Sequence, residues 1–288
     1  MIIERAYAKI NLFLGVKDRR EDGFHNIKSV MHSVTLFDIV SVSASDSDTR
    51  RITVHTDCQE LPLGEDNLVY RSAEKYLSKF NKNATVDIKL DKRIPIGAGL
   101  AGGSSDAAAT LRALNKIFKL ANSDQLLELA AEIGSDVPYC LLGDTALCEG
   151  RGEVMTRLPS PKAMHFVIAI GKERVSTPRA YRALDELYGD AFPCNNEDLE
   201  RLISSLNEGI KCEYLYNIFE DVVKLPEIEK IKEMLIKNKA VATLMSGSGP
   251  SVFGIFSSLS EAQNAAAHIT NSGFEAYYAT SASNGENV

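Results

Sequence analysis

The sequence predicts an α+β protein with two domains, for three reasons. A chain of 288 residues is long enough for two modest domains, each with a core of its own. Pro159 and Pro161 interrupt the apolar pattern, which predicts a boundary between domains of residues 1–158 and 159–288. The chain ends in a strand–turn–strand–helix–strand pattern, which packs as an antiparallel sheet with helices behind it.

The composition is that of an ordinary globular protein, with 44% hydrophobic and 25% charged residues. The net charge of −7 argues against a general nucleic-acid binder, which normally carries a basic surface. An anionic substrate would therefore need a pocket that is locally positive.

Neither export nor membrane insertion is expected. The N-terminal segment lacks the basic stretch and apolar core of a signal peptide, and no apolar run approaches the length of a membrane span. The five cysteines are odd in number and include no Cys-x-x-Cys pair, so neither a disulfide framework nor a zinc site is predicted. We expect a cytoplasmic protein with reduced thiols at Cys58, Cys140, Cys148, Cys194 and Cys212.

Residues 2–16 alternate between two faces and predict a strand. Lys9 and Asn11 share one face of this otherwise apolar run. Two interpretations stay open: an edge strand with one solvated face, or a cation and an amide directed into a substrate cleft. The charged turn of residues 17–25 follows, and a lone histidine such as His25 is typical of a protein surface there.

The first half of the chain continues with a mixture of strand and helix patterns. Asp66 and Asn67 can cap a helix that runs to about Phe80, and Gly134 is the expected end of a later one. The predicted elements are strands at 36–42, 51–55 and 85–90, helices at 67–80, 107–120 and 123–133, and a turn-rich strand pair at 143–152.

The second half predicts further elements up to the ending described above. Residues 165–170 form a buried strand pattern, and Ser176-Thr177-Pro178 begins a helix that carries Tyr181, with proline at an allowed first position. The remaining predicted elements are helices at 197–207, 226–238 and 260–270, strands at 241–245, 251–256 and 274–279, and a glycine-rich turn at 246–250.

The stretch from Ile94 to Asp106 contains four glycines and two adjacent serines just before a predicted helix. Glycine lets the backbone turn tightly and approach a ligand, and the start of a helix attracts phosphate. The spacing matches neither the Walker pattern nor the dinucleotide-binding pattern. From the residues alone, a phosphate-binding loop and a tight structural turn both stay open.

Asp136 follows Gly134-Ser135 and precedes Val137-Pro138. By composition alone, an aspartate at this place is typical of a structural helix cap.

Taken together, these features suit a phosphoryl transferase. Two glycine-rich loops and a polar strand face with Lys9 could position phosphates and stabilise their charge. An acceptor hydroxyl also needs a base or an orienting carboxylate. The sequence contains many carboxylates and does not itself select one.

Four strings, in order along the chain, resemble the GHMP kinases, and within them the 4-diphosphocytidyl-2-C-methyl-D-erythritol kinases of the non-mevalonate isoprenoid pathway. The glycine-rich stretch is similar to the ATP phosphate loop of the whole family. The Asp22-Gly23-Phe24-His25 element resembles one that separates this subfamily from homoserine and mevalonate kinases. The resembling segments are 7–14 with 20–25, 95–108, 134–138 and 244–251.

The resemblance implies a two-domain GHMP kinase fold, with an N-terminal domain like domain 2 of ribosomal protein S5 and a ferredoxin-like C-terminal domain. It implies ATP as co-substrate together with Mg²⁺, whose protein ligands are not assigned, and a small-molecule substrate that carries a cytidine diphosphate group. The residues implied to bind ATP are Asn67, Lys92, Pro95, Gly97, Gly99, Leu100, Ala101, Gly102, Gly103, Ser104 and Ser105.

The resemblance also implies roles for the remaining site residues. Asp136 removes or orients the proton of the acceptor hydroxyl, and Lys9 beside it keeps that carboxylate ionised and stabilises the transferring phosphoryl group. Phe24 and Tyr181 sandwich the pyrimidine, and His25 reads its edge. The other substrate-binding residues are Asn11, Gly247 and Ser248. Asn217 lies in a segment that departs from the family pattern, and no role is assigned to it.

Two alternatives stay open beside this hypothesis. A kinase of the same fold could use homoserine, mevalonate or a sugar as acceptor. A nucleotide-binding regulatory module on the same scaffold is a second alternative, although such a module should have lost either Lys9 or Asp136. The acidic surface is compatible with a monomer or a homodimer.

Overall fold

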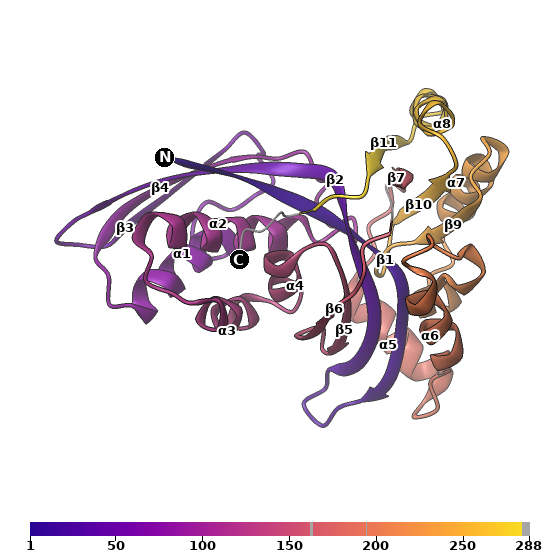
Figure 1. The fold of residues 1–288 in the computed structure, drawn as a ribbon, viewed down its shortest axis with the longest axis horizontal. Helices are drawn as coiled ribbons and strands as arrows, with labels where there is room; N and C mark the ends of the chain where they lie inside the picture. Colours follow the sequence, from indigo (N-terminus) through magenta and orange to yellow (C-terminus); the bar gives the residue numbers. More distant parts are fainter. Residues whose placement is uncertain (162–163, 194, 284–288) are drawn as a thin grey trace.

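The computed structural model describes residues 1–161, 164–193 and 195–283, and its strands form two sheets. The first sheet is built on two long antiparallel strands, which cross most of the molecule (Figure 1). Its order is β3-β4-β2-β1-β8, with β5 on β2 and β6 on β5. The strands are β1 (Ile2–Arg19), β2 (His25–Asp46), β3 (Arg51–Thr56), β4 (Ala84–Asp91), β5 (Thr145–Gly150), β6 (Val154–Arg157) and β8 (Tyr216–Asn217).

The solvated-face interpretation of the first strand is wrong. Lys9 and Asn11 are only 4% and 1% exposed. Near Lys9, the glycine-rich loop covers the edge of β1 that does not pair with β2. The Lys9 N–H donates to the Leu100 carbonyl there, at 3.1 Å. A buried ammonium and a buried amide on one strand face are costly unless they are paired or have a function.

Four helices pack on one side of this first sheet (Figure 1). They are α1 (Leu68–Lys79), α2 (Gly102–Phe118), α3 (Ser123–Ile133) and α4 (Val137–Leu142). Asn67 caps α1 as predicted, accepting from the Val69 N–H at 3.0 Å. The α3 bounds agree with the prediction because Asn122 and Gln125 form a capping box at its start.

The prediction that the second helix begins at residue 107 is wrong, because α2 begins five residues earlier, at Gly102. Ala101 adopts a left-handed conformation, with φ of +56°, and turns the chain so that two glycines form the first helical turn. A Cβ on Gly102 would lie 3.0 Å from Ile94 Cγ2, so close packing overrides the poor helix propensity of glycine.

The second sheet is antiparallel, in the order β11-β7-β10-β9, with α7 and α8 behind it, which confirms the predicted ending. Its strands are β7 (His165–Ile170), β9 (Ala242–Met245), β10 (Ser251–Phe256) and β11 (Glu275–Thr280). The helices of this half are α5 (Thr177–Tyr188), α6 (Asn196–Ser205), α7 (Pro226–Lys237) and α8 (Leu259–Asn271). Two 3₁₀ turns, η1 (Cys212–Tyr214) and η2 (Ile218–Asp221), flank β8.

One apolar cluster joins the two sheets. Ile10 and Leu12 of β1 belong to the same buried cluster as Phe166 and Phe253 of the second sheet. The predicted boundary at residues 158 and 159 falls between β6 and β7 and stays a prediction. The two-residue strand β8 returns from the second half of the chain to pair with β1, which places the 217–220 segment beside the long strands.

No disulfide joins the four cysteines that the structure describes, and Cys194 lies outside the described residues. Burial raises the pKa of the Cys148 thiol to about 12, so this thiol is protonated at neutral pH. Among the described helices, none combines the length and the apolar character that crossing a membrane requires.

Candidate active site

The glycine-rich loop of residues 94–101 connects β4 to α2, and β2 anchors its start. Asp38 is fully buried, and its Oδ1 accepts the backbone N–H groups of Arg93 at 2.5 Å and Ile94 at 2.7 Å. The loop then turns through Gly97 and Gly99, with φ of +70° and +77°. These conformations favour glycine, so the sequence fits the turn at both positions.

The loop packs directly against the second glycine-rich turn, of residues 246–249. The Ser246 hydroxyl donates to the Gly99 carbonyl at 3.3 Å, and the Ser251 hydroxyl donates to the Ala98 carbonyl. A Cβ on Gly99 would lie 2.5 Å from the Ser246 carbonyl oxygen and 3.1 Å from that of Gly249. The two loops therefore form one rigid unit at the meeting point of the two halves.

We expect Gly99→Ala to lower kcat/KM by at least about tenfold more than Gly97→Ala does. Both variants place a side chain at positive φ, which costs about 1–2 kcal/mol. At Gly97 a Cβ meets nothing within 4 Å, whereas at Gly99 it meets backbone oxygens. Steady-state kinetics of both variants, each checked by circular dichroism, would test this. An equal loss of kcat/KM in the two variants would show that the contact between the two glycine-rich loops is unimportant for activity.

One face of the glycine-rich loop lines a cavity of about 340 Å³. The structure brings together ten of the eleven residues predicted to bind ATP in the wall of this cavity. They are Asn67, Lys92, Pro95, Gly97, Gly99, Leu100, Ala101, Gly102, Gly103 and Ser104. Ser105 is not in the wall: it is buried, and its hydroxyl donates to the Tyr7 carbonyl at 2.7 Å, tying α2 to β1.

Lys92 bridges two buried carboxylates. Its Nζ contacts Asp38 Oδ2 and also Asp106 Oδ2, the latter at 2.7 Å. Burial opposes a charged lysine, but the two carboxylates outweigh it and leave the pKa of Lys92 raised. Burial also raises the pKa of Asp106, to about 8, against the attraction of the Lys92 ammonium. The cluster therefore places one ammonium between two buried carboxylates, and Asp38 accepts three hydrogen bonds.

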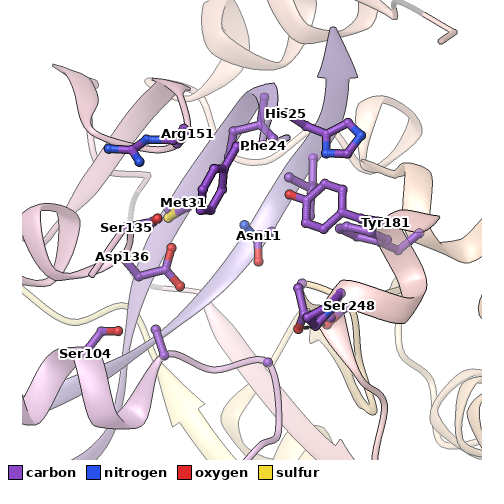
Figure 2. Close-up of a pocket in the computed structure, with 18 of the residues that line it drawn as sticks. Asn11, Phe24, His25, Met31, Ser104, Ser135, Asp136, Arg151, Tyr181 and Ser248 are labelled. Atoms are coloured by element: carbon purple, nitrogen blue, oxygen red, sulfur yellow. Dashed lines mark hydrogen bonds between the residues drawn. The ribbon is translucent and has the colours of Figure 1, made fainter. Parts of the chain in front are cut away.

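The other face of the loop lines a larger cavity of about 610 Å³. Gly99, Ala101 and Ser104 line both cavities, so these residues form a wall that the two spaces share. Figure 2 shows Ser104, Ser135 and Asp136 on one side of this cavity, Tyr181, His25 and Ser248 on the other, and Asn11 between them. All eight predicted catalytic and substrate-binding residues line it: Lys9, Asn11, Phe24, His25, Asp136, Tyr181, Gly247 and Ser248.

Lys9 reaches this cavity along the buried face of β1. Its Nζ donates to Asn11 Oδ1 at 2.7 Å, and Asn11 Nδ2 donates to Ser29 Oγ at 2.8 Å. A Cβ on Gly247 would lie 3.5 Å from the Lys9 Nζ, so the ammonium sits beside the second glycine-rich turn. Lys9 and Asp136 share the cavity, but no ion pair within 4.0 Å joins them in the described chain.

Asp136 begins the short helix α4, but its carboxylate does not cap that helix. The side chain accepts no hydrogen bond from the first helical turn and forms no ion pair with a described residue. The interpretation of Asp136 as a structural cap is therefore not supported. Instead, a half-buried carboxylate without a structural partner lines the larger cavity.

Aromatic side chains close the far end of the cavity. Phe24 is 52% exposed, and the Arg151 guanidinium lies 5.2 Å from its ring centre. The His25 ring stacks on Tyr181 at 4.6 Å with 16° between the planes, and Phe219 meets Tyr181 edge-on at 4.9 Å. His25 is buried, contrary to the surface position typical of a lone histidine.

The cavity is locally positive in a chain of net charge −7, as an anionic substrate requires. Four cationic side chains line it, against the two carboxylates of Asp136 and Asp185. Sequence reasoning found only one of the four. The others, which no motif or spacing marked, are Arg19, Arg151 and Arg182.

Asn217 holds the second glycine-rich turn in place. Its Nδ2 donates to the carbonyls of Met245 at 2.7 Å and Gly247 at 2.8 Å, and its Oδ1 accepts from the Phe219 N–H at 3.0 Å. The side chain is 3% exposed. Asn217, to which the sequence assigned no role, thus acts as a clamp: its side chain links β8 to the 246–249 turn by hydrogen bonds.

We expect Asn217→Ala to lower the free energy of unfolding by about 1–3 kcal/mol, because two buried carbonyls lose their donor. Asn217→Asp should be at least as destabilising, since a carboxylate oxygen would replace the donor and face both carbonyls. Urea titration measures both. A stable Asn217→Asp variant would contradict the clamp.

The comparisons with known proteins agree with this geometry. The family model described as GHMP kinases N terminal domain matches residues 67–144, and that described as GHMP kinases C terminal matches residues 194–275. The chain is 42% identical to 4-diphosphocytidyl-2-C-methyl-D-erythritol kinase of Caldicellulosiruptor bescii, over 92% of this chain and 93% of the relative. It is 40% identical to the enzyme of the same name from Clostridium novyi, over 90% and 92%.

A crystal structure of 4-(cytidine 5'-diphospho)-2C-methyl-D-erythritol kinase superposes with a TM-score of 0.83 at 32% identity, covering 98% of this chain and all of that one. Fold and site thus define a small-molecule kinase with two glycine-rich loops. The chain belongs to the GHMP kinases and, within them, to the family of the 4-diphosphocytidyl-2-C-methyl-D-erythritol kinases.

Proposed function

We propose that this chain transfers the γ-phosphoryl group of ATP to the 2-hydroxyl of 4-diphosphocytidyl-2-C-methyl-D-erythritol. The products would be the 2-phosphate and ADP, in the non-mevalonate route to isoprenoid precursors. One observation carries the proposal: a single glycine-rich loop borders both cavities, so a phosphate held at Gly99 to Ser104 faces an acceptor held beside Asp136. The names of the relatives support the choice of acceptor.

The glycine-rich loop and the start of α2 would hold the ATP phosphates. Ala101 turns the chain so that the first N–H groups of a 17-residue helix follow the loop directly. These N–H groups have no partner within the helix, and the helix dipole adds positive potential at this end. Lys92 would act on the nucleotide side mainly by fixing the loop, because its ammonium is already bound to Asp38 and Asp106.

Asp136 would accept or orient the proton of the acceptor hydroxyl. A carboxylate that does not cap its helix and forms no ion pair within the described part of the chain is available for this task, and a positioned base contributes about 10²–10⁴-fold to a rate. Lys9, which lines the same cavity, would stabilise charge on the transferring phosphoryl group. Asn11 holds the Lys9 ammonium in place and would thereby position it for the reaction.

The structure describes no cluster of three or more acidic, histidine or cysteine side chains that could hold a metal ion without a substrate. Ser104 and Asp136 do line the cavity with oxygen atoms of the kind that Mg²⁺ accepts, alongside substrate phosphates. These residues fit an ion that arrives on ATP. Mg²⁺, when bound, would neutralise charge on the phosphate oxygens.

The aromatic end of the cavity would hold the cytosine. Phe24 and Tyr181 offer ring faces for stacking, and His25 offers a ring nitrogen to the edge of the base. The His25 ring covers one face of Tyr181. Gly247 and Ser248 would lie along the diphosphate, with the Ser248 hydroxyl held 2.7 Å from that of Thr177.

The cysteine usage and the small-molecule substrate support a cytoplasmic location, as proposed above.

The position of phosphorylation tests the proposed function. Purified protein, Mg²⁺-ATP and 4-diphosphocytidyl-2-C-methyl-D-erythritol would be incubated, and the product analysed by ¹³C and ³¹P NMR. We expect ADP and a new phosphate whose ³¹P nucleus splits the ¹³C signal of C2, the carbon that bears the 2-hydroxyl and the methyl group. A phosphate at another hydroxyl, or no transfer, would contradict the proposal.

A further inference from the structure

His25 and Asp185 form a buried contact that the proposed reaction does not use. His25 Nε2 lies 2.6 Å from Asp185 Oδ1, and the two side chains are 5% and 22% exposed. The contact joins the start of β2 to helix α5 and links two residues that are 160 positions apart in the sequence.

The surroundings fix the histidine ring on several sides. Asp185 follows Tyr181 by one helical turn, so α5 presents the stacking ring and the carboxylate on the same face. Phe192 meets the imidazole edge-on at 5.8 Å. The Arg19 Nε lies 3.9 Å from Asp185 Oδ2, which keeps a cation beside the carboxylate.

The contact determines which ring nitrogen carries the proton. A carboxylate oxygen accepts the hydrogen bond in this contact, so the uncharged form of the imidazole is the tautomer that carries its proton on Nε2, toward Asp185. The other nitrogen, Nδ1, is then an acceptor. It forms no hydrogen bond with any residue in the described part of the chain, and the His25 side chain lines the larger cavity.

We propose that Asp185 is a positioning residue that sets base selectivity: it fixes His25 with Nδ1 as an acceptor, so that the site favours a pyrimidine with a hydrogen-bond donor at ring position 4. Cytosine presents an exocyclic amine, which donates, and uracil presents a carbonyl oxygen at the same ring position, which accepts. Uracil would therefore leave Nδ1 facing a second acceptor. This inference rests on the proposed function and specifies how its substrate is recognised.

The variants at position 185 have distinct expected effects. Asp185→Asn can donate its amide N–H to Nε2, which moves the ring proton to Nδ1 and makes that atom a donor. Asp185→Ala removes the preference between the two His25 tautomers, which carry the proton on Nε2 or on Nδ1. Asp185→Glu keeps a carboxylate that can accept from Nε2. Glu186→Gln is the matched control, because Glu186 is the next residue of α5 and is exposed.

The experiment measures kcat/KM of wild type and these variants for 4-diphosphocytidyl-2-C-methyl-D-erythritol and for its uridine counterpart. We expect wild type and Glu186→Gln to prefer the cytidine compound by at least about tenfold, as loss of one hydrogen bond with an unpaired group left behind implies. Asp185→Asn should lower this ratio at least about tenfold, Asp185→Ala should lower it less, and Asp185→Glu should restore it.

Several outcomes would overturn the inference. One is an unchanged ratio of kcat/KM for the cytidine and uridine compounds in both Asp185→Asn and Asp185→Ala. If kcat/KM falls equally for the two substrates, the ratio is also unchanged, and Asp185 has a structural role alone. If Asp185→Asn does not fold, the ratio in Asp185→Ala against Asp185→Glu decides. Wild type that phosphorylates both compounds equally overturns this inference only. Wild type that phosphorylates neither overturns the proposed function as well.

Discussion

Replacing Asp136 by asparagine is expected to lower kcat by about 10²–10⁴-fold, which is the usual contribution of a positioned general base. Asparagine has the same shape as aspartate but cannot accept the proton of the acceptor hydroxyl. The Asp136 carboxylate does not cap α4, so the substitution should leave the helix and the free energy of unfolding nearly unchanged. KM for both substrates should change little, because the loss falls on the chemical step.

Steady-state kinetics and thermal unfolding of Asp136→Asn would be measured together. Asp124→Asn is a suitable control, since Asp124 is an exposed acidic residue in the first turn of the neighbouring helix α3. Near-wild-type kcat in Asp136→Asn would remove Asp136 from the proton transfer. A large loss of stability in this variant would instead indicate a structural role.

Replacing Lys9 by methionine is expected to lower kcat by about 10²–10³-fold, as removal of one preorganised charge-stabilising group commonly does. Methionine fills the same buried space on β1 without the charge. The ammonium lies beside the second glycine-rich turn, where it donates to Asn11 Oδ1 at 2.7 Å and Gly247 allows close approach. Without the Lys9 ammonium, no buried cation at this position would stabilise the negative charge on the transferring phosphoryl group.

Lys9→Arg keeps the charge but not the compact shape, so we expect it to retain more activity than Lys9→Met. Single-turnover kinetics would separate the chemical step from product release, and ATP affinity would be measured by calorimetry. Unchanged ATP affinity with slow chemistry fits the proposed role. A Lys9→Met variant with wild-type chemistry would show that Lys9 serves only to fill the strand face.

Much of the fold was predictable because local signals agreed with tertiary packing. The helix at 123–133 carries its own capping residues, and the closing strand–helix–strand pattern is strongly periodic. The start of α2 could not be predicted, because close packing of Gly102 against Ile94 overrides helix propensity. The strand β8 could not be predicted either, since two residues carry no periodicity.

The candidate site also contains residues that could be predicted from the sequence and residues that could not. The motif residues meet in two adjoining cavities, as the order of the four strings implied. The network around Lys92 could not be read from the sequence, because Asp38 lies 54 residues away and no spacing brings it together with Lys92 and Asp106 before the chain folds. Arg151 lies in a charged turn and Asp185 on an amphipathic helix. The local sequence of either element does not show whether a charged side chain faces a cavity or solvent, so both residues were missed.

The most direct test of the proposed reaction is a competition assay read by mass spectrometry. Wild type and Asp136→Asn would each receive Mg²⁺-ATP and an equal mixture of 4-diphosphocytidyl-2-C-methyl-D-erythritol, homoserine and mevalonate. We predict that wild type phosphorylates the cytidine compound alone and that the variant phosphorylates none of the three at a comparable rate. Phosphorylation of homoserine or mevalonate in preference to the cytidine compound would contradict the proposed substrate, and no transfer despite ATP binding would contradict the proposed reaction.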